Sequence, residues 1–151
     1  MNSVTETDTS SLLNQLFVGA SVNGVRFGSL QLLFYPASGS GELFVNLSSA
    51  FQIFESRPAA FPESESDVPE QSQEEEILSL FELRGYEISQ VEIVEPAGHL
   101  ALTFANGMVL YVNGSNAGPE PWHAGLNAFD HKDSIWVIAI SGGRPFAYMP
   151  G

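Results

Sequence analysis

Apolar and polar residues alternate most clearly just after the middle of the chain. Residues 100–104 (LALTF) and 108–112 (MVLYV) each carry large apolar side chains at every second position, which is typical of strands with a buried face. They flank Asn106-Gly107, a dipeptide that favours tight turns. Only a three-residue connection, which pairs Phe104 with Met108 and gives the glycine a left-handed conformation, brings the apolar residues of both strands to one face. The pattern therefore predicts a hairpin with a bulged turn.

A similar pattern occurs in the first half of the chain. Glycine and apolar residues recur with a spacing of 66 residues, so that positions 19, 22, 25 and 27 match positions 85, 88, 91 and 93. The strands that follow, over 30–34 and 43–47, match the two strands of the hairpin. We therefore predict a mainly β (α+β) fold of two related antiparallel β units, over residues 12–56 and 85–150. The two units are expected to pack as a sandwich or a partly open barrel, with one helix between them.

Residues 57–84 separate the two units and change character along their length. The first part is rich in proline, serine and acidic residues and is expected to be a linker or mobile loop, because it has too little apolar surface to order itself. Ser72 and Glu75 then match a capping box, and the apolar spacing that follows predicts a helix of about three turns ended by Gly85. Residues 1–11 are polar and are expected to be disordered, so that residues 12–151 form a single domain.

The C-terminal part of the chain predicts two further strands. Residues 135–140 (IWVIAI) are apolar on both faces, which is typical of a central strand buried twice. Residues 145–149 follow a glycine turn and begin with Pro145, whose missing N–H favours an edge position. We expect these strands to complete the second unit.

The composition limits the class of partner. The chain has 18 acidic and 5 basic residues and a formal net charge of −13, and 11 of the acids lie between Glu63 and Glu95. The clusters of Lys and Arg that neutralise phosphates are absent, which argues against binding of double-stranded nucleic acid or of an anionic membrane. A basic protein partner suits this charge best, although an acidic surface also serves solubility alone.

The cysteine content and the apolar runs of the chain limit its chemistry and its cellular compartment. The chain has no cysteine, which excludes disulfides, thiolate nucleophiles and cysteine-bound metals. The polar N-terminus does not resemble a signal peptide, and no apolar run approaches the about 20 residues of a membrane span. We therefore expect a cytoplasmic protein.

The histidines and serines match no catalytic pattern. His123 and His131 lie eight positions apart with Glu120 nearby, and this spacing corresponds to no metal motif. No G-x-S-x-G motif surrounds Ser115, and the glycine-rich stretch around it is not followed by a helix or a lysine that would hold a phosphate. We therefore predict no catalytic residue, no metal ligand and no cofactor.

Two groups of residues are candidates for binding. The loop after the hairpin is rich in residues that adopt turn conformations, and its candidate side chains are Asn113, Ser115, Asn116, Glu120 and Trp122. Trp122 suits an interface anchor, but a core tryptophan whose indole N–H bonds a backbone carbonyl is favoured. The second group is the acidic run Glu74, Glu75 and Glu76, which is also typical of a solvated first helical turn.

The order of motifs in residues 78–150 resembles a small bacterial domain family of unknown function. The shared features are the hairpin with its N-G turn, then Gly114-Ser115-Asn116, Glu120-Pro121-Trp122 and Ser141-Gly142-Gly143, where the family has a proline in place of Ser141. This resemblance implies an all-β or α+β fold and brings no activity or catalytic residue. In size and charge the chain also resembles the acidic immunity proteins of polymorphic-toxin systems.

These observations give one principal hypothesis of function and two alternatives. The principal hypothesis is a non-enzymatic protein-binding module, an immunity-type inhibitor that covers a basic partner with an acidic face. The first alternative is a small hydrolase or metal-dependent enzyme that uses the 113–123 loop with His123, His131 and Glu120. The second is a structural module that assembles through an edge strand over residues 144–149. The sequence leaves the oligomeric state open.

Overall fold

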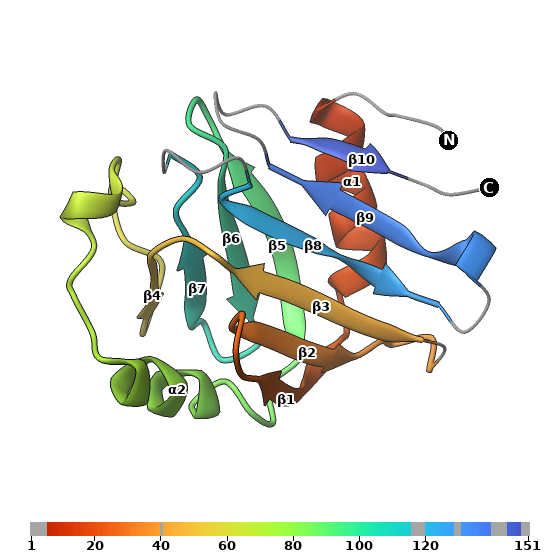
Figure 1. The fold of residues 1–151 in the computed structure, drawn as a ribbon, viewed down its shortest axis with the longest axis horizontal. Helices are drawn as coiled ribbons and strands as arrows, with labels where there is room; N and C mark the ends of the chain where they lie inside the picture. The colour runs from red at the N-terminus through yellow and green to blue at the C-terminus, as the bar shows by residue number, and fades with distance from the viewer. Residues whose placement is uncertain (1–5, 40, 116–119, 129–130, 140–144, 149–151) are drawn as a thin grey trace.

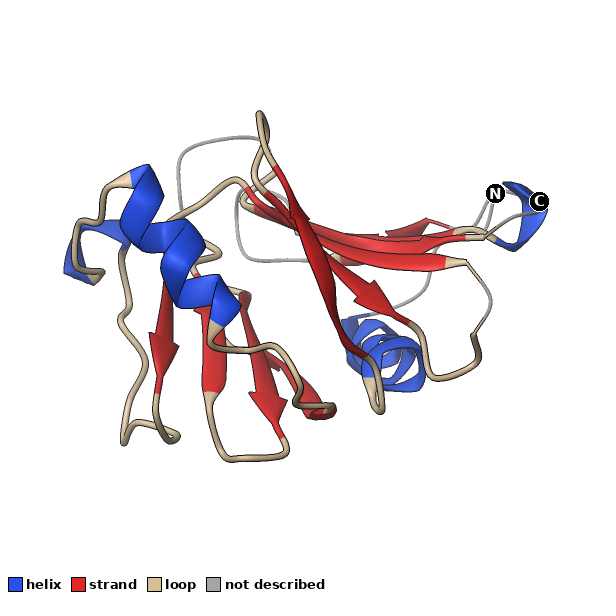
Figure 2. Cartoon of the chain, turned by 90° about the horizontal axis from the view of Figure 1, so that it is seen from below, coloured by secondary structure: helices blue, strands red, loops and turns tan. Residues whose placement is uncertain are grey.

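The chain forms two antiparallel β-sheets that lie at an angle to each other (Figures 1 and 2). The computed structural model describes residues 6–39, 41–115, 120–128, 131–139 and 145–148. The larger sheet has six strands, in the order β1 (Ser21–Arg26), β2 (Gln31–Tyr35), β3 (Glu42–Leu47), β8 (Trp122–Asn127), β9 (Ile135–Ile138) and β10 (Phe146–Tyr148). The smaller sheet has four strands, in the order β4 (Phe51–Phe54), β7 (Val109–Val112), β6 (His99–Phe104) and β5 (Ile88–Val94).

These sheets confirm the predicted mainly β, α+β fold. The described strands form an open sandwich and close no barrel. Two helices, α1 (Glu6–Phe17) and α2 (Gln73–Phe81), and two short 3₁₀ turns, Glu65–Asp67 and His131–Asp133, complete the described elements. Neither of the described helices has the length and apolar character needed to cross a membrane.

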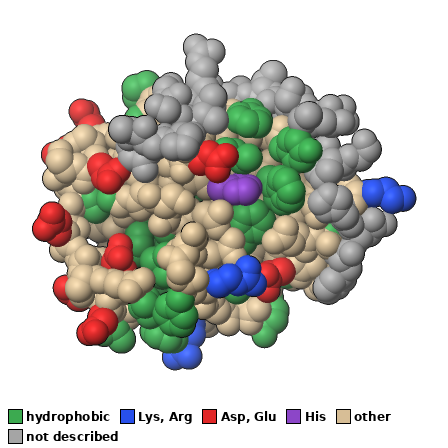
Figure 3. Space-filling model, in the orientation of Figure 1, with side chains coloured by type: hydrophobic (Ala, Val, Ile, Leu, Met, Phe, Trp, Pro, Cys, Tyr) green, Lys and Arg blue, Asp and Glu red, His purple; other side chains and the backbone are tan. Residues whose placement is uncertain are grey.

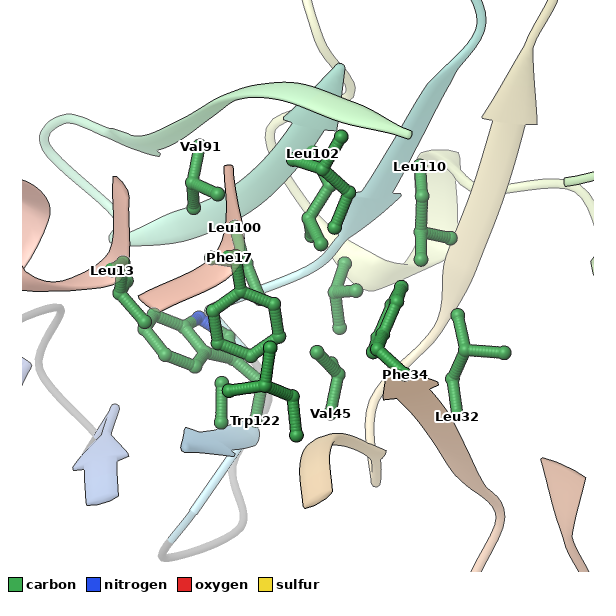
Figure 4. Close-up of a cluster of buried hydrophobic side chains, with 14 of the residues drawn as sticks. Leu13, Phe17, Leu32, Phe34, Val45, Val91, Leu100, Leu102, Leu110 and Trp122 are labelled. Carbon is green, nitrogen blue, oxygen red and sulfur yellow. The ribbon is translucent and has the colours of Figure 1, made fainter. Parts of the chain in front are cut away.

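The hydrophobic core lies between the two sheets and α1 (Figure 4). Alternate residues of the larger sheet point inward, among them Phe34 and Val45, and meet Leu100 and Leu102 of the smaller sheet. All four side chains are almost fully buried. Burial of apolar surface of this kind is the main term that stabilises a sandwich of two sheets.

The predicted hairpin has the predicted register. Leu102 pairs with Leu110, and the Phe104 N–H donates to the Met108 carbonyl at 2.8 Å. Gly107 has φ +94°, the left-handed conformation that the three-residue connection requires. The hairpin prediction is therefore confirmed.

The spacing of 66 residues corresponds to a structural repeat. Gly19 and Gly85 both have positive φ, +88° and +87°, after the end of a helix. The strand that follows each glycine carries an irregularity at the same place, between Val22 and Gly24 in β1 and between Ile88 and Gln90 in β5. Each first strand is then followed by two antiparallel strands. A bridge joins Ser21 to Glu87, two residues that are themselves 66 positions apart.

The two sequence units do not correspond to the two sheets, because each unit sends its fourth strand to the other sheet. β4 of the first unit pairs with β7, and β8 of the second unit pairs with β3. Residues 48–50 make one of these crossings and residues 113–121 make the other. The polar extension of the second unit is therefore a connection between sheets. The predicted sandwich is confirmed, and each of its sheets contains strands from both units.

Helix α1 contradicts the expectation of disorder up to residue 11 and of strand character from residue 12. Leu13 and Phe17 lie one helical turn apart and are almost fully buried in the core. The Asn14 side chain holds the helix to β5, because its amide donates to the Val91 carbonyl at 2.6 Å and its oxygen accepts from the Val91 N–H at 2.9 Å. These partners are far away in the sequence, so local polarity did not reveal the helix.

Helix α2 begins as predicted. The Ser72 side chain accepts from the Glu75 N–H at 3.1 Å, and the Glu75 carboxylate accepts from the Ser72 N–H at 3.2 Å. The helix lies below β4 and β7 in Figure 1 and contributes Leu80 to the core. The chain then passes Gly85 and enters β5.

The C-terminal strands agree only partly with prediction. β10 is at the edge of the larger sheet, as Pro145 indicated. β9 lies between β8 and β10, but Trp136 and Ile138 are only partly buried. The prediction that this strand is buried on both faces is therefore wrong for its described residues, because no described helix or strand lies over the outer face of the larger sheet (Figure 2).

Candidate functional site

The loop predicted for binding is mainly an internal connection. Trp122 is fully buried at the start of β8, and its indole N–H donates to the Gly98 carbonyl at 2.8 Å. The interpretation of Trp122 as a core residue is confirmed, and its selection as a binding residue is wrong. Glu120 is exposed, and Asn116 lies outside the described residues.

Asn113 is also fully buried and is a structural residue. Its amide donates to the Tyr111 hydroxyl at 2.8 Å, and its oxygen accepts from the Ser115 N–H and hydroxyl, each at 2.8 Å. Ser115 is exposed, and its hydroxyl also lies 3.2 Å from the Glu63 backbone oxygen. The described part of this loop therefore attaches the linker to the smaller sheet, and the side-chain polar atoms of buried Asn113 are used in internal hydrogen bonds.

The acidic linker has a defined path over the outer face of the smaller sheet. The Phe61 ring stacks on the Tyr111 ring with centroids 5.4 Å apart, and the Tyr111 hydroxyl donates to the Pro62 carbonyl at 2.6 Å. Arg57 forms an ion pair with Glu92 of β5 at 2.7 Å. The expectation that this segment cannot order itself is wrong because the sheet supplies the aromatic partner that the linker lacks.

An acidic cleft of about 850 Å³ opens between the linker, β4 and the start of α2. Phe51 and Val68 provide apolar surface, and both are at least nine-tenths buried. The carboxylates of Glu65, Glu70 and Glu76 line the cleft, and no lysine or arginine does so among the described residues. We refer to this group of five residues as the acidic cleft.

Only one of the three acids predicted at the start of the helix lines the acidic cleft. Glu76 does so, and partial burial raises the pKa of its carboxyl. Glu75 is occupied by the capping box, and Glu74 is exposed to solvent outside the cleft lining. Sequence reasoning missed Glu65 and Glu70 of the linker and Phe51 of β4. The density of acids in the linker was the only signal for the two glutamates.

The outer face of the larger sheet carries a row of aromatic side chains. The rings of Phe44 and His123 lie 5.0 Å apart, those of His123 and Trp136 lie 6.0 Å apart, and Trp136 stacks on Tyr148 at 5.4 Å. In the space-filling view, hydrophobic side chains lie beside a histidine near the middle of this face, and an acidic side chain adjoins it (Figure 3). We refer to Phe44, His123, Trp136, Ile138 and Tyr148 as the aromatic face.

His123 belongs to this face and is separated from His99. Its Nδ1 lies 3.4 Å from the Asn46 amide nitrogen, while its buried Nε2 has no hydrogen-bond partner among the described residues. Burial lowers the pKa of His123, and the nearby Glu120 carboxylate acts in the opposite direction. Across the described residues, no group of three or more His, Asp or Glu side chains is arranged to hold a metal ion.

His99 lies on the smaller sheet and faces the linker. Its Nδ1 accepts a hydrogen bond from the Gly114 N–H at 2.9 Å, and its ring contacts Tyr111 with centroids 5.2 Å apart. The two histidines that flank the hairpin and loop in the sequence therefore belong to different sheets and form no common site. Comparisons of the chain with protein-family models, curated proteins and solved structures find no match.

Proposed function

We propose that this protein is a binding module for a basic protein partner, which it engages through the acidic cleft. The supporting observation is the cleft itself, whose lining combines three glutamates with the apolar residues Phe51 and Val68. Lysine and arginine side chains combine an apolar stem with a charged end, so they suit such a lining. The charge of the chain around the cleft is also negative, since Arg84 is the only basic residue between Glu63 and Glu95.

The same arrangement suits an inhibitor of the immunity type. Long-range attraction between an acidic and a basic protein speeds their association, and short-range pairing inside a cleft slows dissociation. An acidic cleft placed over a basic active surface of the partner would exclude the substrate of that partner. No catalytic group on this chain is needed for that action.

A charge-matched pair of variants tests the role of the acidic cleft. The first variant replaces Glu65, Glu70 and Glu76 with Gln, and the control replaces the exposed acids Glu55, Glu82 and Glu87 with Gln. Both variants lose the same net charge. Calorimetric titration with an arginine-rich peptide at low salt is expected to show binding at least about tenfold weaker for the first variant and little changed for the control. Equal losses would show that only the overall charge matters, which would contradict the proposal.

A second candidate function is self-association through the aromatic face. Trp136, Ile138 and Tyr148 are partly exposed there without a covering element in the described part of the chain. The charge on this face is partly neutralised, because Glu42 lies 3.6 Å from Arg26 in an ion pair, while Glu120 adds one acidic side chain near His123. Apolar surface of low charge on an acidic protein favours contact with a second copy over contact with a basic partner.

A further inference from the structure

A second, smaller cavity lies on the outer side of the smaller sheet. Its volume is about 400 Å³, within the range of small-ligand sites. The linker contributes Phe61 and Glu63 to its wall, the turn between β5 and β6 contributes Glu95 and Pro96, and β6 contributes His99. It shares no lining residue with the acidic cleft.

His99 gives this cavity a hydrogen-bond donor of fixed direction. The residue is only 4% exposed, and its Nδ1 accepts from the Gly114 N–H. A neutral imidazole whose Nδ1 is an acceptor carries its proton on Nε2. Nε2 forms no hydrogen bond within the described part of the chain, and His99 is one of the residues that line the cavity. The cavity wall therefore offers an N–H that can donate and cannot accept.

The charge around this donor is negative. Burial lowers the pKa of His99 although the Glu63 carboxylate acts in the opposite direction, so the ring is neutral near pH 7. Glu63 and Glu95 are both exposed residues of the cavity lining and provide oxygen acceptors. A complementary ligand must accept one hydrogen bond at His99 and donate at least one to a carboxylate.

This requirement excludes several common ligands. A carboxylate ligand has the acceptor but meets the negative charge of Glu63, and an ammonium or guanidinium ligand has donors only and would face the His99 N–H. A sugar ring usually packs on an open aromatic face, but the Phe61 ring is already stacked on Tyr111 and lies under the Arg57 guanidinium. A neutral amide fulfils both conditions with adjacent atoms.

We propose that this cavity binds a primary carboxamide, whose carbonyl accepts from His99 Nε2 and whose NH₂ donates to Glu63. The group can come from a free small amide or from an Asn or Gln side chain of a peptide, which present the same chemistry. Phe61 and Pro96 surround the apolar part of the ligand. The site is independent of the basic partner proposed for the acidic cleft.

Proton NMR of the intact protein tests this site with four probes of equal length: propionamide, propionate, propylammonium and propanol. Propionamide is expected to shift the His99 ring resonances saturably in the millimolar range of so small a fragment, and at least about fivefold more tightly than the other three. The ring resonances of His123, on the other sheet, serve as the internal control and should not move. Replacing both Glu63 and Glu95 with Gln should weaken propionamide binding and reduce the discrimination against propionate.

The outcomes separate the proposal from its rivals. A ¹⁵N spectrum with the His99 proton on Nδ1, the absence of a saturable shift with propionamide, or equal shifts at His123 would each overturn it. Equal binding of propanol would also overturn it and would indicate a hydroxyl site. If propionamide binds, a Gln-containing peptide and its Glu counterpart identify the source of the amide. Binding of the Gln peptide at least about tenfold tighter than that of the Glu peptide and of free propionamide indicates a peptide side chain. Equal affinities of the Gln peptide and free propionamide indicate a small amide.

Discussion

The indole N–H of Trp122 connects the start of β8 in the larger sheet to the backbone just before β6 in the smaller one. Replacing Trp122 with Phe leaves the buried Gly98 carbonyl without this donor and removes core volume. We expect a loss of about 2–4 kcal/mol in the free energy of unfolding, measured by urea denaturation. Trp136→Phe on the partly exposed aromatic face is the control and should cost less than half as much. Equal losses would contradict the role assigned to the Trp122 hydrogen bond.

Buried His99 and partly buried His123 predict a specific pH dependence of stability. Burial lowers the pKa of His99 and of His123, so the unfolded chain binds their protons more readily than the folded chain does. The contribution of the two neutral histidines to the free energy of unfolding is therefore fully present above the pKa of about 6.5 that they have in the unfolded chain. It is lost as the pH falls through their lower pKa values in the folded chain. Urea denaturation should show a lower free energy of unfolding at about pH 5.5 than at about pH 7.5.

Two variants isolate the histidine contribution. His99→Asn retains an acceptor for the Gly114 N–H, and His123→Asn retains a polar group beside Asn46. Each variant should lose less stability between the two pH values than the original chain does. If both variants show the same pH dependence of stability as the original chain, groups other than these histidines cause it.

At the scale of single elements, the bulged hairpin depends on one backbone conformation. Gly107 has φ +94°, and a Cβ added there would meet no atom within 4 Å. A Cβ added at Gly24 would also meet no atom within 4 Å, but Gly24 has no positive φ. We expect Gly107→Ala to lower the free energy of unfolding by about 1–2 kcal/mol and Gly24→Ala to change it by less than about 0.5 kcal/mol. Thermal or urea denaturation measures both. Similar effects at the two positions would show that left-handed strain is not the cause.

The elements that the sequence predicted correctly depend on local signals. The hairpin is specified by the period of its apolar residues and by Asn106-Gly107, and the start of α2 by the capping pair Ser72 and Glu75. Helix α1 depends on the contact of Asn14 with β5, and the linker depends on Tyr111, so neighbouring residues carried no signal for either. The crossing of the fourth strands also follows from long-range pairing, which alternation alone does not specify.

The candidate site also combines residues that local sequence signals predict with residues that only long-range contacts bring together. Glu76 was predicted because it belongs to a local acidic run, whereas Phe51, Glu65 and Glu70 come together only through the path of the linker. Asn113 and Trp122 were selected for polar or aromatic character in a glycine-rich stretch. They are buried because that stretch crosses between the sheets.

At the scale of the whole molecule, the aromatic face predicts self-association at high concentration. Sedimentation of the intact protein should show a dimer that Ile138→Asp removes, because a charge on a desolvated apolar face is costly. Leu78→Asp, at a side chain that is 65% exposed on α2, is the control and should leave the dimer unchanged. A monomer at every concentration would contradict this prediction, and a dimer that survives Ile138→Asp would indicate pairing at the β10 edge.

The proposed division of the surface places the acidic cleft on one side and the aromatic face on another. Mapping of backbone amide NMR shifts during titration with an arginine-rich peptide tests this division most directly. We predict that the largest shifts fall at Phe51 and along residues 65–76, and that they weaken as salt rises. Shifts of equal size at Glu42, Glu82 and Glu87, which do not line the cleft, or shifts centred on the aromatic face, would contradict binding in the acidic cleft.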